Sequence, residues 1–267
     1  MSSYWVWDVD EVFFHIWGPF SVRWYSLLFL SGLLLGHYLF NLMAKAENKP
    51  TEPSETAFAY IVLGTVIGAR IGHCLFYNPS YYFSDPLRIL KVWEGGLASH
   101  GGYVGVITAA YLLSRKVKEY PFLWFIDRVA IVSVLGGAFI RLGNFFNSEI
   151  VGKVTNVSWA VIFTRYDQSP RHPAQIYEAI AYALISMILY FVYRYHKRSP
   201  LPGRLLGLAL FLGFFFRFFI ENLKENQVSY EDAMAFNMGQ SLSIPLAVIG
   251  FSMFIGVPQK FFIKKSK

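Results

Sequence analysis

The feature that most constrains this chain is a series of apolar stretches, each about as long as a membrane-spanning helix. A helix needs about 20 mostly apolar residues to cross the hydrocarbon core of a bilayer. The sequence supplies such stretches at residues 20–43, 56–76, 98–114, 121–140, 174–194, 204–221 and 240–258. The third and the seventh are the weakest, because each is short or begins with polar residues. We therefore predict an all-α polytopic membrane protein of about seven transmembrane helices, forming a single domain over residues 1–267.

The composition supports a membrane protein and argues against other classes. Charged residues make up 15% of the chain, whereas a soluble domain has about 25%. The net charge of +7 does not indicate nucleic acid, because the basic residues are not clustered with stacking aromatic residues. The single cysteine, Cys74, excludes an internal disulfide and a cysteine metal cluster. We expect no metal, because the six histidines are scattered, and no nucleotide cofactor, because no glycine-rich loop is present.

The basic residues predict the orientation of the chain in the membrane. Cytoplasmic loops of membrane proteins carry an excess of Lys and Arg. If the N-terminus lies outside, thirteen of the 24 basic residues fall on the cytoplasmic side, nearly all in short loops or the tail: Lys45, Lys49, Arg115, Lys116, Lys118, Arg194, Lys197, Arg198, Arg204, Lys260, Lys264, Lys265 and Lys267. We therefore predict an outer N-terminus and a cytoplasmic C-terminus.

With this orientation, ionisable and amide side chains gather at the outer ends of the apolar stretches. A charge at the bilayer centre costs roughly 2.5–3.5 kcal/mol on the most lenient scale, so such residues usually face a polar cavity or one another. Snorkelling to the headgroups is the alternative, and it suits Arg23, Arg88 and Lys91 better than Glu178 and Glu221. We predict a polar cavity at the outer leaflet, bordered by outer loops 141–173 and 222–239. Its candidate residues are Tyr25, Arg70, His100, Arg141, His172, Gln175, Glu178, Arg217, Glu221 and Gln240.

The segment ASHGGYVG begins the third stretch and combines a histidine with two glycines. Glycines at a helix N-terminus let an anion approach free backbone N–H groups, so His100, Gly101 and Gly102 suggest an anion site. Close packing of two membrane helices is the alternative explanation for a glycine pair.

Three further segments place polar residues at helical spacing. In RHPAQIYE, Gln175 and Glu178 share one helix face, and in RFFIE, Arg217 and Glu221 stand four residues apart. For both pairs a structural role remains an equal alternative. In IRLGNFFNSEIVG, Arg141 and Asn144 share a face, while Gly143 and Gly152 allow a bend or a close approach to a ligand. Because a guanidinium matches a phosphate and amides hold ester groups, we interpret this segment, with Asn147 and Glu149, as a headgroup clamp.

Together these segments resemble one protein family. VRWYSLLFL, GARIGHCLFYN, WEGGLASHGGYVGV, RLGNFFNSEIVG, RHPAQIYE and MGQSLSIP follow one another in the order and spacing of the prolipoprotein diacylglyceryl transferases of bacterial inner membranes. The resemblance extends from about Arg23 to Pro245. Two positions depart from the family pattern: Ser148 replaces the usual glycine before the glutamate, and Lys224 stands nearest a usual arginine.

The resemblance implies a multi-pass enzyme of the inner membrane whose active site faces the periplasmic leaflet. Such an enzyme moves the diacylglyceryl group of phosphatidylglycerol to the lipobox cysteine thiol of a prolipoprotein, and glycerol phosphate leaves. The family motifs imply functional roles for Tyr25, His100, Arg141, Asn144, Glu149, Gly152, Arg217 and Glu221.

Our mechanistic hypothesis assigns the catalytic roles to four residues. Arg141 and Arg217 stabilise the phosphate, and His100 is the candidate base because an imidazole suits proton transfer at neutral pH. Tyr25 either takes the base role or positions the proton path. The alternative from another class is a membrane lipid-binding or transport protein with an outward-facing anion site. Transporters often show internal repeats and a site near mid-membrane, and neither is evident here.

Overall fold

The computed structural model describes residues 4–17, 20–77, 79–92, 95–196, 200–225 and 236–256. These residues form two compact units, one of residues 40–128 and one of the remaining described chain. Two long helices, α1 and α5, contribute residues to both units.

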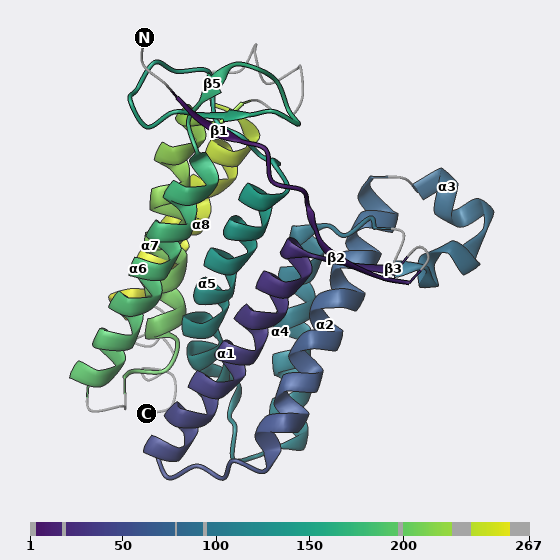
Figure 1. Ribbon diagram of the computed structural model, residues 1–267. Helices are drawn as coiled ribbons and strands as arrows, with labels where there is room; N and C mark the ends of the chain where they lie inside the picture. The colour runs from purple at the N-terminus through teal and green to yellow at the C-terminus, as the bar shows by residue number, and fades with distance from the viewer. Residues whose placement is uncertain are drawn as a thin grey trace. The chain divides into compact units, whose positions relative to one another are not determined.

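Each predicted apolar stretch corresponds to a helix (Figure 1). The seven are α1 (Trp24–Ala46), α2 (Pro53–Phe76), α4 (Ser99–Lys116), α5 (Phe122–Phe146), α6 (Ala174–Tyr195), α7 (Arg204–Ile220) and α8 (Met238–Phe254). Within the described chain, five helical segments are long and apolar enough to cross a membrane: α1, α2, α5, α6, and α7 with the turn after it. Helix α8 is apolar but shorter. The protein is therefore mostly helical with several candidate membrane spans, as expected.

Several helix boundaries differ from the prediction, and two of the differences have a clear consequence. The first span was expected from residue 20, but residues Phe20–Arg23 form strand β3, and the helix begins at Trp24. Strand β3 pairs with β2 (Val12–Trp17) in an antiparallel hairpin, which explains why these apolar residues are not helical. The fourth span was expected to end at residue 140, with a loop beginning at 141. Helix α5 instead continues to Phe146, so the first six residues of the predicted loop are helical.

In the unit of residues 40–128, α2 and α4 pack through facing glycines. A Cβ atom added to Gly105 would lie 1.9 Å from the carbonyl oxygen of Gly64, and one on Gly101 would lie 2.2 Å from that of Gly68. Small residues four apart let two membrane helices approach closely. Along the chain, α2 is connected to α4 by the short helix α3 (Pro79–Ser84) and the 3-10 helix η1 (Pro86–Leu90).

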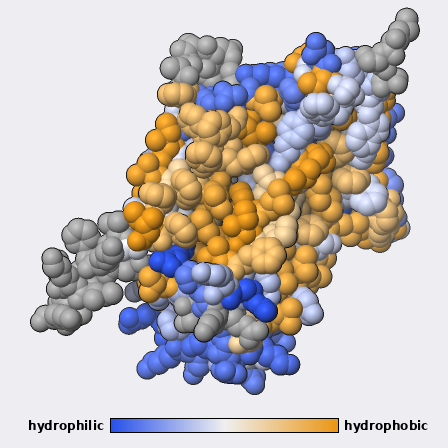
Figure 2. Space-filling model, turned by 90° about the vertical axis from the view of Figure 1, so that its left-hand side faces the viewer, coloured by the Kyte–Doolittle hydropathy of each residue, from blue (hydrophilic) through white to orange (hydrophobic). Residues whose placement is uncertain are grey.

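In the other unit, α7 and α8 also cross at glycines. A Cβ atom on Gly250 would lie 2.5 Å from the backbone nitrogen of Phe211, and one on Gly207 would lie 2.6 Å from that of Phe254. Figure 2 shows hydrophobic residues over the middle of the face that carries α6 and α7, with hydrophilic residues towards both ends. This distribution is typical of a membrane-embedded surface.

A small sheet, which the sequence did not predict, covers one end of this unit (Figure 1). Strand β1 (Trp5–Trp7) runs parallel to β4 (Val161–Phe163), which pairs antiparallel with β5 (Pro170–Arg171). Beneath it lies a core cluster of Phe145, Val151, Val161 and Phe163, against which Trp7 and Ile176 pack. The chain start is thereby tied to the segment between α5 and α6, and this is the end of the unit at which the polar residues gather.

Candidate active site

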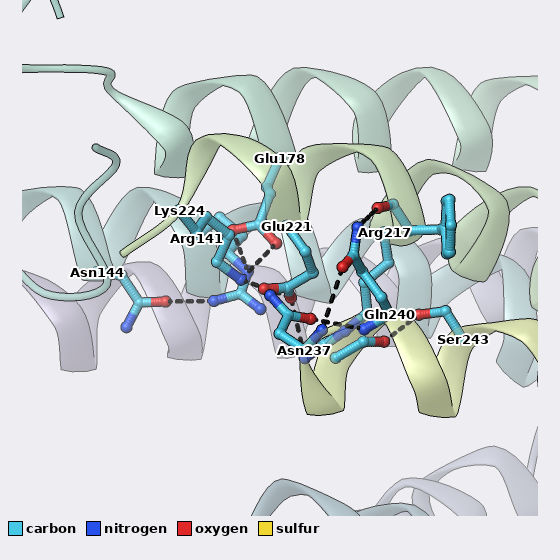
Figure 3. A network of polar contacts seen from close by, with 11 residues as sticks. Arg141, Asn144, Glu178, Arg217, Glu221, Lys224, Asn237, Gln240 and Ser243 are labelled. Atoms are coloured by element: carbon cyan, nitrogen blue, oxygen red, sulfur yellow. Dashed lines mark hydrogen bonds and ion pairs between the residues drawn. The ribbon is translucent and has the colours of Figure 1, made fainter. Parts of the chain in front are cut away.

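A network of five charged residues joins the ends of α5, α6 and α7 (Figure 3). Glu178 lies 3.2 Å from Arg141 Nε and 3.7 Å from Lys224 Nζ, measured to its carboxylate oxygens. Lys224 Nζ also lies 3.0 Å from Glu221 Oε1, which is 3.3 Å from Arg217 Nη2. Two carboxylates are thus shared among three cations.

Local structure explains why these side chains meet. Arg141 lies in the last turns of α5, and Glu178 lies in the second turn of α6, after Pro173 at the helix start. Arg217 and Glu221 stand at positions i and i+4, where helical side chains are neighbours. The 3-10 turn η3 (Glu221–Leu223) then brings Lys224 back over Glu221.

The burial of this network decides its electrostatics. The carboxylate of Glu178 is fully buried and Lys224 is buried, whereas Arg217 is about one-third exposed. A buried carboxylate keeps its charge only when it is paired, and Glu178 has one cation from α5 and another from beyond α7. Because cations outnumber carboxylates by one, these five residues together carry a net positive charge and suit an anionic ligand.

The segment predicted to be a headgroup clamp extends this network. Asn144 Oδ1 accepts a hydrogen bond from Arg141 Nη1 at 3.3 Å, and Asn144 Nδ2 donates to Glu149 Oε2 at 3.1 Å. Asn147 Nδ2 donates to the other oxygen of Glu149 at 3.2 Å. The backbone carbonyl of Glu149 accepts from Gln175 Nε2 at 2.7 Å. Four of the predicted site residues on α5 and its following turn, together with Gln175 of α6, therefore form one connected set.

The backbone around Glu149 is strained. Ser148 and Ile150 have φ angles of 55° and 54°, in the left-handed region that favours glycine. Strain of this kind clusters at functional sites, because the surrounding structure must hold it. It also explains the family's usual glycine before the glutamate, which this chain replaces with Ser148.

Two of the glycines singled out in the sequence have close neighbours that leave no room for a side chain. A Cβ atom on Gly143 would lie 2.6 Å from the ring of Tyr25, so this ring lies directly against α5. A Cβ atom on Gly152 would lie 2.5 Å from the carbonyl oxygen of His172. Gly152 also forms a β-bridge with Lys224, so it helps to place this lysine beside Glu178.

His172 and Gln175 border the network at the start of α6. His172 Nδ1 lies 3.3 Å from the hydroxyl of Tyr177, which accepts a hydrogen bond from Trp159 Nε1 at 2.7 Å. Burial lowers the pKa of His172 below its ordinary value. Gln175 is fully buried, and among the described residues its Oε1 has no hydrogen-bond partner. This buried acceptor is available to a ligand donor.

The remaining predicted site residues belong to the unit of residues 40–128. His100 is exposed in the first turn of α4. Gly101 packs against α2, as the helix-packing alternative expected, while Gly102 has only ordinary contacts. Arg70 is buried, and its guanidinium donates to the backbone carbonyls of an adjacent loop.

Sequence reasoning named Lys224 only as a departure from a motif and did not include it in the site. Its spacing of three from Glu221 is the signal that could have identified it. Asn237 was also missed: it forms a capping box with the predicted residue Gln240 at the start of α8, and Gln240 Nε2 donates to the carbonyl of Phe218 at 3.2 Å. Gly239 packs against the Glu221 carboxylate. The start of α8 therefore closes one side of the network.

An apolar groove lies between α7 and α8 next to these polar residues. Its cavity has a volume of about 390 Å³ and is lined by Phe211, Phe214, Phe215, Phe218, Phe219, Ser243, Ile244, Ala247, Val248 and Phe251. The two helices are in contact at Gly207 and Gly250, so the groove lies on the side of this crossing towards Glu221.

In the described chain, no group of three or more His, Cys, Asp or Glu side chains could hold a metal ion.

Comparisons with known proteins agree over almost the whole chain. Residues 11–256 match the sequence model of the family described as prolipoprotein diacylglyceryl transferase. The chain is 46% identical over 249 residues to the phosphatidylglycerol–prolipoprotein diacylglyceryl transferase of Tolumonas auensis, covering 93% of this chain and 96% of the relative. It is 46% identical to that of Chloroherpeton thalassium, covering 93% and 92% of the two chains. For the Bacteroides fragilis protein of the same name, identity is 42% over 94% of this chain and 95% of the relative.

Proposed function

Because this chain belongs to the prolipoprotein diacylglyceryl transferase family, we propose that its charged network binds the phosphate of phosphatidylglycerol during diacylglyceryl transfer. The acceptor is the thiol of a lipobox cysteine in a prolipoprotein. The observation that carries this proposal is the net positive network of Arg141, Lys224 and Arg217 around two carboxylates. A phosphodiester is the anionic part of this lipid, and arginine N–H groups match its oxygens.

The reaction replaces a carbon–oxygen bond with a carbon–sulfur bond. The thiol loses its proton to a base, and the thiolate attacks carbon 3 of the diacylglyceryl group. The bond from this carbon to the phosphate oxygen breaks, and its electron pair leaves on glycerol phosphate. Arg141 and Arg217 stabilise the charge on the leaving phosphate, and Asn144 orients the headgroup. Glu178 and Glu221 hold the arginines in place rather than transferring protons.

The base remains one of two candidates. His100 is the first, since it is exposed at the start of α4 and an imidazole is the side chain most often used as a general base. Tyr25 is the second, and its ring already lies against Gly143 of α5. A pH–rate profile distinguishes them: loss of the acid limb in His100→Gln but not in Tyr25→Phe identifies His100.

The apolar helices and the loop charges support the membrane arrangement that we propose. All seven helices cross the bacterial inner membrane, with the N-terminus outside, so that the network faces the periplasmic leaflet. Loops 141–173 and 222–239 border the cavity, although residues 226–235 of the second lie outside the described chain. The groove between α7 and α8 receives an acyl chain of the donor lipid, because its lining is apolar and it adjoins the network.

The experiment that tests this function measures glycerol phosphate release from phosphatidylglycerol and a lipobox peptide by the purified protein. Arg141→Ala removes a donor to the leaving phosphate, so we expect release to fall about 100-fold. Arg115→Ala, an exposed arginine in the last turn of α4, is the matched control and should retain activity. A wild-type protein that is folded and binds the lipid but releases no glycerol phosphate would instead be a lipid-binding or transport protein.

A further inference from the structure

The segment between α2 and α4 exposes more apolar surface than a loop in water usually does. We call residues 79–92 the arm; they comprise α3, Asp85, η1 and the two residues after η1. Its side chains of Phe83, Leu87 and Leu90 are 62%, 70% and 70% exposed. Large exposed apolar patches mark surfaces that contact another molecule or a membrane. The arm follows directly after α2, a candidate membrane span that ends at Phe76, and Figure 1 shows α3 projecting away from the ends of α2 and α4.

One arginine donates hydrogen bonds to three backbone carbonyls of the arm. Arg70 Nε donates to the carbonyl of Ile89 at 2.9 Å, and Nη2 donates to those of Arg88 and Lys91 at 2.5 and 3.0 Å. Its Nη1 donates to the carbonyls of Gly95 and Gly96 in the loop that follows. All five N–H groups of the guanidinium are therefore used on the arm and this loop.

Two of the three charged residues of the arm, Arg88 and Asp85, pair within it. Arg88 Nε lies 3.0 Å from Asp85 Oδ2, and the Arg88 guanidinium lies over the ring of Tyr81 at 4.3 Å from its centre. The ring of Tyr82 is likewise buried under Arg70, at 4.8 Å. The arm thus combines exposed apolar side chains with one internal ion pair and three carbonyls bonded by Arg70.

This combination identifies the medium that the arm contacts. The carbonyl of Arg88 also accepts from the N–H of Lys91. The last carbonyls of a 3-10 turn generally have no partner within the turn, and in water the solvent would supply one. In a lipid environment no water is available, so irregular backbone must be satisfied by the protein itself. We propose that the arm lies in the boundary between the lipid headgroups and the acyl chains, with Phe83, Leu87 and Leu90 in the hydrocarbon. Arg70 is then a positioning residue that prepares the arm for lipid, rather than a ligand of the substrate.

Site-specific fluorescence in nanodiscs tests this proposal without using the transfer reaction. In a Cys74→Ala background, Leu87→Cys is labelled with an environment-sensitive dye, and the full-length protein is placed in phosphatidylglycerol–phosphatidylethanolamine nanodiscs. Ser158→Cys, in the exposed loop between α5 and α6, is the water-exposed control, and Ile188→Cys, exposed on α6, is the hydrocarbon control. We expect the Leu87 label to emit near the Ile188 label and to be quenched more by nitroxide lipids than by iodide. Nitroxides near the headgroup should quench it more than those near the chain end.

Either of two other results would overturn the proposal. Iodide quenching equal to that of the Ser158 label would place the arm in water. An apolar emission that nitroxide lipids do not quench would mean that a protein surface, such as the acceptor chain, covers the arm.

A second comparison tests the role of Arg70. Arg70→Lys keeps the charge but cannot reach five carbonyls, so the Leu87 label should shift towards the emission of the Ser158 label. Arg115→Lys, the same change at an exposed position in this unit, should leave the emission unchanged. An unchanged emission in Arg70→Lys would refute the positioning role. Should Arg70→Lys fail to fold, the measurement with native Arg70 still decides where the arm lies.

Discussion

Replacing Glu178 with glutamine tests whether the buried network holds this unit together. The change removes one charge and almost no volume, and it leaves Arg141 and Lys224 without their shared carboxylate. At an effective dielectric constant of about 20, two attractions at 3.2 and 3.7 Å contribute roughly 10 kcal/mol between them. Removing the fully buried carboxylate from water costs several kcal/mol, which offsets about half of this gain. We expect Glu178→Gln to lower the free energy of unfolding by about 3–5 kcal/mol.

The same substitution at Glu11 provides the control. Glu11 also lies between two arginines, at 3.5 Å from Arg23 and from Arg165, but its side chain is 34% exposed. Exposed ion pairs contribute at most about 1 kcal/mol, so Glu11→Gln should have little effect. The two variants therefore differ mainly in the burial of the carboxylate that is removed.

Thermal unfolding in detergent, followed by far-UV circular dichroism, measures both variants. A loss of 3–5 kcal/mol corresponds to a fall in Tm of about 10 °C for a chain of this size. The double variant Glu178→Gln, Lys224→Met also removes one cation and should recover part of the loss. Equal and small shifts for Glu178→Gln and Glu11→Gln would refute the reasoning, because burial would then have no effect.

Three further predictions concern the backbone, the helix packing and pH. Ser148→Gly should raise the unfolding free energy by about 1 kcal/mol, because glycine adopts a φ of 55° without strain; an unchanged Tm would contradict this. Gly105→Ala should destabilise the protein by about 3 kcal/mol, since its Cβ would overlap the α2 backbone, whereas Gly136→Ala, with nothing within 4 Å, should stabilise it by about 1 kcal/mol. Equal Tm values for these two alanine variants would be the contrary outcome. Hydrogen bonds from Arg171 lower the pKa of Asp167, so its contribution to stability is present at neutral pH and is lost as the pH falls through that lowered pKa. Asp167→Asn should therefore reduce Tm at pH 7 and make no difference well below pH 4, and a constant difference across this range would be inconsistent with the assignment.

The parts of the fold that follow from local patterns could be predicted from the sequence. A membrane helix needs only an apolar run of sufficient length, so all seven helical stretches could be located. Arg141 and Asn144 could be placed on one helix face because their spacing of three residues fixes it. Their hydrogen bond of 3.3 Å agrees with that prediction.

The parts that depend on distant pairing could not be predicted. The contact between Glu178 and Lys224 requires that α6 and the turn after α7 lie together, and no local pattern encodes that. The pairing of Trp5 with Val161 joins residues far apart in the sequence. Arg70 is another residue whose partners could not be predicted from the sequence. Its sequence position predicts a buried charge, but only the structure shows that its partners are backbone carbonyls, which carry no sequence signal.

The excess of one cation in the network reconciles folding with anion binding. Three cations without counterions would repel one another at these distances and would leave buried Lys224 uncompensated, so the unit would be unstable before any lipid arrived. A third carboxylate paired directly with these cations would satisfy every cation and leave no attraction for a phosphate. Glu149, which the network reaches through Asn144, accepts instead from the amides of Asn144 and Asn147. With Glu178 and Glu221 each shared between two cations, the buried charges are paired and one positive charge remains. The more exposed partner is Arg217, so this residue is the one through which the network can meet a ligand without first breaking its buried pairs.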